Sequence, residues 1–182
     1  MPEWLIGFIG GVLATVLGFV LTMSWDLFKH RKEAKEREKT VEGFVGMELT
    51  ENRRILLSNQ RLLENELRSL DENKMLVLPL TLFRMGFWEL LKGHLPFPGK
   101  YRSSSAVLDL LVVVELTTDI NETMRSREVF RLHNQGTADF VAQIRIYDKR
   151  LIEDGQMLLK YLDKLDPEAK EYEHIAEELL KS

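Results

Sequence analysis

The first feature of the hydrophobic pattern is an uncharged apolar run over residues 5–23. A helix of these nineteen residues is roughly 28 Å long at about 1.5 Å rise per residue, close to the thickness of a bilayer's hydrocarbon core. Trp4 and Trp25 flank the run, and indole rings favour the two membrane interfaces. The pattern therefore predicts a transmembrane anchor over residues 1–27.

Basic residues crowd the C-terminal side of this run, whereas Glu3 is the only charged side chain before it. The positive-inside rule then places the N-terminus outside and the rest of the chain in the cytoplasm, as a single-pass protein of the inner membrane. A cleaved signal peptide is disfavoured, because no Lys or Arg precedes the apolar run. Residues 28–40 are predicted to form a charged juxtamembrane helix carrying Lys29, Arg31, Lys32, Lys35, Arg37 and Lys39.

Small residues share one face of the predicted span. Their spacings of four, three and four residues fit a single helix seam, where small side chains let two helix backbones approach closely. Glycine is also common in membrane helices that do not associate. We interpret the seam as an assembly face of a homo-oligomer, formed by Gly7, Gly11, Ala14 and Gly18.

From residue 41 onward an apolar stripe repeats at spacings of four and three, which is typical of a helix packed in a coiled-coil-like bundle. Three polar residues, Glu48, Asn52 and Asn59, interrupt this stripe. Polar side chains at such positions normally hydrogen-bond across helices and set register or oligomeric state. Residues 41–182 are predicted to be one cytoplasmic helical domain, and a ligand-binding role for the polar seam is the alternative.

The rest of the domain also has helical patterns, separated by Pro and Gly signals. The run 110–114 could be a buried strand, but the chain offers no alternating partner strand, so a buried helix is favoured. We predict an all-α fold in which a transmembrane helix precedes an antiparallel bundle of four or five helices. The predicted elements after residue 71 are an extended segment at 76–80, helices at 82–94, 103–133 and 138–165, and a short final helix from Pro167 to about residue 180.

Composition narrows the possible functions. The net charge is −4 and the body beyond residue 40 is acidic, so general nucleic-acid binding is not expected. Without cysteine the chain has no disulfide or thiolate metal site. The four histidines are scattered, and no nucleophile elbow, phosphate-binding loop or dinucleotide motif occurs. We expect no enzyme activity, no cofactor and no metal.

One loop combines cations and hydroxyl groups at a predicted helix start. Free backbone N–H groups and the helix dipole favour an anion at such a position. Arg125, Arg127 and Arg131 form a second basic group toward the other end of the same helix. An exposed loop with a serine cap is the plainer interpretation. The candidate anion-binding residues are Lys100, Arg102, Ser103 and Ser104.

Three short motifs resemble a known kind of protein: Glu48-Leu49-x-x-Asn52, Phe87-Trp88-Glu89-x-Leu91 and Ile120-Asn121. They are similar to those of uncharacterised prokaryotic membrane proteins with one N-terminal span and an all-helical cytoplasmic domain. The resemblance covers residues 1–125. It implies the architecture alone, because that group brings no catalytic or binding residues to transfer.

Together these patterns predict a membrane-anchored interaction or scaffold protein. It would lie in a lipid bilayer, self-associate through its span and bind a cytoplasmic protein partner. The alternative is a membrane effector or sensor, in which an anionic or nucleotide ligand binds near Lys100 and Arg102 and rearranges the stalk around Gly43 and Gly46.

Overall fold

The structure is a computed structural model that describes residues 3–72, 74, 77–92, 97 and 99–167, without the side chains of residues 3–16 and 90–92. The chain divides into two units, residues 1–40 and 41–182. The described residues form helices and no strand, which confirms the all-α class.

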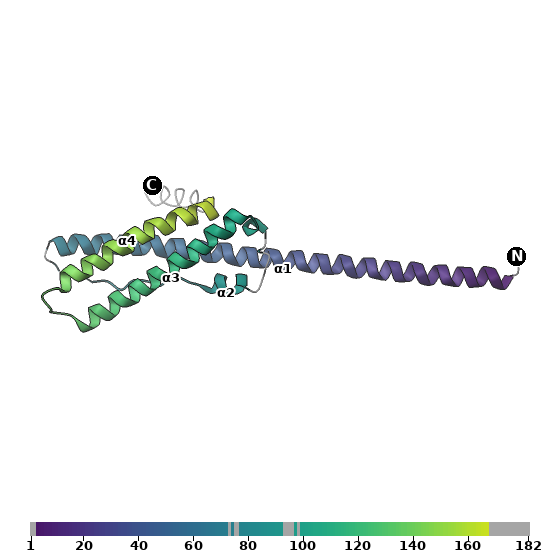
Figure 1. The fold of residues 1–182 in the computed structure, drawn as a ribbon, viewed down its shortest axis with the longest axis horizontal. Helices are drawn as coiled ribbons and strands as arrows, with labels where there is room; N and C mark the ends of the chain where they lie inside the picture. Colours follow the sequence, from purple (N-terminus) through teal and green to yellow (C-terminus); the bar gives the residue numbers. More distant parts are fainter. Residues whose placement is uncertain (1–2, 73, 75–76, 93–96, 98, 168–182) are drawn as a thin grey trace, which may run out of the picture. The chain divides into compact units, whose positions relative to one another are not determined.

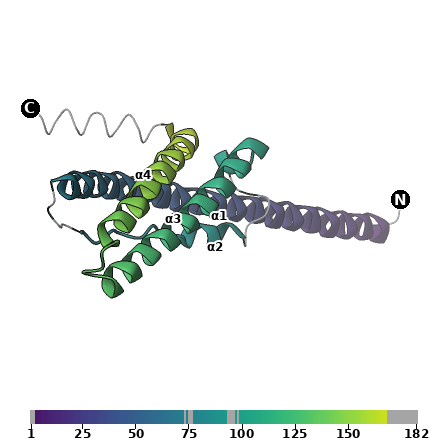
Figure 2. The same ribbon diagram turned by 60° about the vertical axis from the view of Figure 1, so that its left-hand side comes forward.

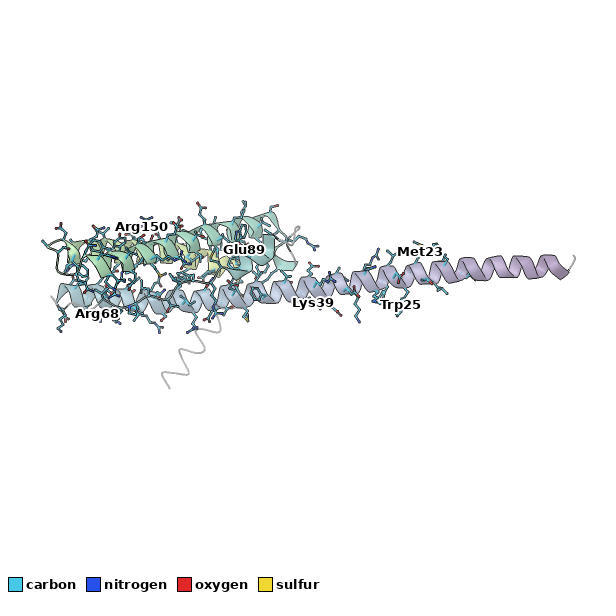
Figure 3. The ribbon with its side chains drawn as sticks, turned by 90° about the horizontal axis from the view of Figure 1, so that it is seen from below. Met23, Trp25, Lys39, Arg68, Glu89 and Arg150 are labelled. Atoms are coloured by element: carbon cyan, nitrogen blue, oxygen red, sulfur yellow. The ribbon has the colours of Figure 1, made fainter. Side chains whose placement is uncertain are left out.

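The first unit consists of the N-terminal part of helix α1 (Glu3–Asp71). Its described side chains are almost all exposed, from Leu17 through the charged residues up to Lys39. Figure 3 shows Met23, Trp25 and Lys39 projecting outward from α1. The helix continues through Gly43 and Gly46 into the second unit.

The predicted membrane span is not supported by the hydropathy of the described helices. Within the part of the chain that the structure describes, no helix combines the length and the apolar character needed to cross a bilayer. The side chains of residues 5–16, which make up most of the predicted span, lie outside the described residues.

The second unit is a helical bundle. It combines α1 from Val41 onward with α2 (Gly86–Lys92), the 3-10 helix η1 (Gly99–Tyr101), α3 (Ser104–His133) and α4 (Phe140–Leu165). Helices α3 and α4 lie side by side and antiparallel, joined by a short turn (Figures 1 and 2). α3 runs in the same general direction as this part of α1, because the chain first returns along it through residues 77–85 and α2 (Figure 1). The antiparallel arrangement predicted from the sequence therefore describes α4 and not α3.

The core lies between α1, α3 and α4, with Phe83 and Phe87 added from the returning segment and α2. The predicted seam of α1 is buried from Val41 to Asn59, as the four-three spacing indicated, while Leu62 is half-buried. α4 comes very close to α1 at Gly155, where a Cβ atom would stand 2.9 Å from Leu56 Cδ1.

Some predicted boundaries differ from the structure. Helix α2 begins at Gly86, not at residue 82, because residues 81–85 are held in an extended conformation. Residues 110–114 are helical, yet only Leu110 and Val113 among them are buried. Four α-helices lie within the described ranges, and the predicted final helix after Pro167 lies outside them.

Candidate functional site

An extended segment, residues 77–85, returns along α1, and we name it the strap. Two asparagines of α1 bind its backbone. Asn52 accepts from the N–H of Arg84 and donates to its carbonyl, both at 2.8 Å. Asn59 does the same with Thr81, at 3.0 and 2.7 Å. Each asparagine thus satisfies one donor and one acceptor of the strap backbone, as a neighbouring β-strand would.

Two further side chains complete this hydrogen-bonding pattern. From α3, Asn121 accepts from the N–H of Phe83 at 2.9 Å and donates to its carbonyl at 3.1 Å, and both bonds are buried. From α1, Glu66 accepts from the N–H of Leu78 at 3.0 Å. Because Asn52, Asn59 and Glu66 are seven residues apart, they share one face of α1 and follow the strap along its length.

A buried ion cluster joins three helices where the strap begins. Arg127 of α3 donates from Nη2 to Glu66 Oε1 of α1 at 2.5 Å and from Nε to Asp148 Oδ1 of α4 at 2.7 Å. Its Nη1 donates to the carbonyl of Leu78 at 3.3 Å. All three charged side chains are at most 1 % exposed. Such a cluster ties the helices into one arrangement, because removing Arg127 would leave two buried carboxyl groups without a cation.

Charge in this cluster is unbalanced, since two carboxyl groups share one guanidinium. Burial raises the pKa of Asp148 to about 7, a shift that Arg127 opposes and Glu66 reinforces. Asp148 Oδ2 has no hydrogen-bond partner within the described residues. A proton on Asp148 leaves the cluster neutral, with one carboxylate for one guanidinium. The cluster can therefore take up and release a proton near neutral pH.

Glu48, the first residue of the predicted polar seam, differs from the other two. It is buried on α1 beside Gly86, but its Oε1 has no hydrogen-bond partner among the described residues. The seam therefore contains two asparagines that bind the strap and one glutamate with a carboxylate oxygen that has no hydrogen-bond partner among the described residues.

The four candidate anion-binding residues lie around η1 and the start of α3. Ser103 is the N-cap of α3, and its Oγ accepts from the N–H of Ala106 at 3.2 Å. Lys100 Nζ lies 3.9 Å from Asp166 Oδ1. Arg102 and Ser104 are exposed. The second basic group lies toward the other end of α3, where Arg127 is buried and Arg131 pairs with Glu128, so the two groups do not form one site.

A carboxylate of the protein itself, that of Glu42, already accepts a hydrogen bond from the backbone at η1. Glu42 Oε1 accepts from the N–H of Lys100 at 3.4 Å. Gly99 has a φ of +53°, and a Cβ atom at this position would stand 1.9 Å from Glu42 Oε2. Glycine is required here both by the left-handed conformation and by the close carboxylate. An external anion would have to compete with Glu42 for this position.

The predicted assembly face cannot be followed through the structure. The surroundings of Gly7, Gly11 and Ala14 lie outside what the structure describes. Gly18 is described, and a Cβ atom there would have nothing within 4 Å. The assembly face therefore stays a prediction from spacing.

Sequence patterns assigned no site role to Asn121, Glu66 or Asp148, and they placed Arg127 in a second basic group with Arg125 and Arg131. A signal for two of them was present. Glu66 continues the seven-residue spacing of Asn52 and Asn59, and Asp148 falls between Ile144 and Leu151 on the buried stripe of α4. An acidic residue at such a position predicts a buried cation, and Arg127 is that cation.

Comparisons with known proteins do not add to this picture. The chain matches no protein family, no curated protein and no solved structure. The resemblance to single-span membrane proteins therefore stays an interpretation of three short motifs, and the candidate site stands on its own geometry.

Proposed function

We propose that the protein is a membrane-anchored interaction protein, held in a bilayer by residues 5–23. The observation that carries the proposal is the surface of α1 after residue 16. Its apolar side chains pack on nothing described, and exposure is as high as 64 % for Phe19 and 68 % for Leu21. The exposed apolar residues of this stretch are Leu17, Phe19, Val20, Leu21, Met23, Trp25, Leu27 and Phe28.

These side chains point to lipid because they cover most of the helix surface. Successive residues of a helix are about 100° apart, so the apolar residues between 17 and 23 leave only the side that carries Gly18 and Thr22. A helix that lies on a protein core has one apolar stripe and one charged or polar face, whereas residues 17–23 contain no charged side chain. Apolar surface gains roughly 25 cal/mol for each Å² removed from water, and a bilayer would cover all sides of the helix at once.

In this proposal the second unit binds the partner protein. Apolar side chains that are exposed on α3 and α4 support this role, because contact with a partner would cover them. Self-association through the span is a further part of the proposal. The exposed apolar residues of this unit include Leu108, Val129, Leu132, Ile146 and Met157.

A ligand-gated effector has less support. The anion site that this alternative needs would use the backbone at Lys100, which Glu42 already fills. Gly43 and Gly46, the expected flexible point, lie within helix α1.

Membrane fractionation tests the anchor. Wild-type protein should stay in the membrane pellet after alkaline carbonate extraction. Replacing Ala14 and Leu17 by lysine should release it, because each lysine near the centre of a span costs about 2.5–3.5 kcal/mol on insertion scales. Leu108→Lys, on the exposed face of α3, is the control and should stay in the pellet. Wild-type protein in the soluble fraction would contradict the anchor.

Cross-linking in membranes tests self-association. Gly11→Ile with Gly18→Ile should abolish cross-linked oligomers if the small residues let the helices meet. Gly43→Ile, outside the predicted span, is the control. Oligomers that survive the double substitution would remove the assembly face from the proposal.

A further inference from the structure

A groove opens on the second unit between α1 and the end of the strap. Its volume is about 630 Å³. One side is apolar, formed by Phe44 and Met47, which are 38 % and 61 % exposed. The other residues that border it are Glu48, Thr50, Glu51, Arg84 and Gly86.

Glu48 is the unusual group of this groove. Its side chain is buried, with 4 % of the residue exposed, and Oε1 has no hydrogen-bond partner among the described residues. The carboxylate lies against the backbone of Gly86, where a Cβ atom would stand 3.2 Å from Oε2. A buried carboxylate oxygen without a hydrogen-bond partner is unfavourable, and a cation that reached it would remove this cost.

The other charges at the groove are already paired with one another. Glu51 accepts two hydrogen bonds from Arg54, at 3.0 and 2.8 Å. Arg84 Nη2 lies 4.0 Å from Glu51 Oε1. Arg54 and Arg84 therefore both face Glu51, and Glu48 is the acidic group here that an incoming cation can complement.

We propose that this groove binds an arginine or lysine side chain of a partner protein, presented beside an apolar residue. The cationic head would pair with Glu48. The apolar neighbour and the aliphatic stem would lie on Met47 and Phe44, since methionine adapts to varied shapes and an aromatic ring attracts a cation. The partner surface is thus a basic segment interrupted by apolar residues. This inference deepens the proposed interaction function and names its partner chemistry.

A peptide-binding measurement tests the groove on the full chain in phosphatidylcholine nanodiscs. The probe is a labelled short peptide of alternating leucine and arginine. The control peptide has the same sequence with citrulline, a neutral isostere, in place of each arginine. Fluorescence anisotropy, with empty nanodiscs subtracted, should give a Kd about tenfold or more tighter for the arginine peptide. Glu48→Gln should remove this preference. Glu64→Gln, an exposed residue of the same helix, should keep it.

A thermal melt accompanies the binding measurement and shows that each variant is folded. Glu48→Gln should melt at the same temperature as wild type or higher without peptide, because it removes a buried uncompensated charge. The arginine peptide should then raise the Tm of wild type and not that of Glu48→Gln. Equal affinity of wild type and Glu48→Gln for the arginine peptide would overturn the proposal, as would no binding to either. Neither result would alter carbonate extraction, so a failed groove and a failed anchor are distinguishable.

Discussion

At the scale of single residues, the buried cluster of Glu66, Arg127 and Asp148 governs how the helices meet. Each member comes from a different helix, so sliding one helix along another would break the ion pairs of the cluster. A hydrophobic trio of similar volume could be equally stable, but it would not require one register. We therefore expect the cluster to contribute more to the uniqueness of the fold than to its stability.

The pKa of Asp148 makes stability depend on pH. Its pKa is raised from 3.8 to about 7, so between these values the folded protein binds more protons than the unfolded chain. The contribution of Asp148 to the unfolding free energy should therefore fall as pH rises from 4 to 7 and level off above. Asp148→Asn, which mimics the protonated form, should lose this slope in chemical denaturation followed by circular dichroism.

Exposed Asp119 on α3 supplies the control for this titration. Asp119→Asn should keep the wild-type slope between pH 4 and 7. Glu51 and Glu128, whose pKa values are lowered by hydrogen bonds from Arg54 and Arg131, act in the opposite direction but remain in every variant. A wild-type slope that persists in Asp148→Asn would show that the cluster does not titrate in this window.

At the scale of elements, the strap shows how a segment without a strand partner forms the hydrogen bonds that its backbone N–H and C=O groups need. Side-chain amides from α1 and α3 replace the ladder that a sheet would provide. This arrangement also explains why α2 starts late. Phe83 and Arg84 are held extended by Asn121 and Asn52, so the helix can form only beyond them.

Among the hydrogen bonds that hold the strap, the two between Asn121 and Phe83 should cost the most unfolding free energy when they are removed. Asn121→Leu leaves the buried N–H and C=O of Phe83 unpaired, and the expected loss is about 2–4 kcal/mol of unfolding free energy. Hydrogen exchange at the Phe83 amide should become faster at the same time. Thr118→Val on the same helix removes only an exposed bond to Val114, and its effect should stay within about 0.5 kcal/mol. Similar losses in the two variants would mean that the strap is not held through Asn121.

Sequence patterns predict some of these elements well and others poorly, for physical reasons. The start of α3 follows from Ser103, because a cap acts within one turn, and the buried stripe of α1 follows from its own spacing. The start of α2 depends on Asn52 and Asn121, which are remote in sequence, so local propensity placed it four residues too early. The groove beside Glu48 had no local signal, because strap and helix form it together.

At the scale of the whole molecule, the proposed anchor implies a fixed orientation. The chain has no cysteine, so one introduced thiol reports on one site alone. Ser58→Cys, exposed on α1, should resist a membrane-impermeant maleimide in intact cells and react fully after lysis. Labelling of intact cells would place the second unit outside and contradict the positive-inside prediction.

Helix α1 contains both the proposed span and the first core helix, and this has a consequence for synthesis. Arg53 of α1 meets Asp163 of α4, 110 positions later in the chain. At about 5–20 residues per second, the ribosome needs roughly 5 to 20 s to supply that partner. During this interval the nascent helix displays Val45, Leu49 and Leu56 before the complete bundle exists to cover them. Delivery to the membrane during translation would bring the chain there while its bundle face is still open to chaperones.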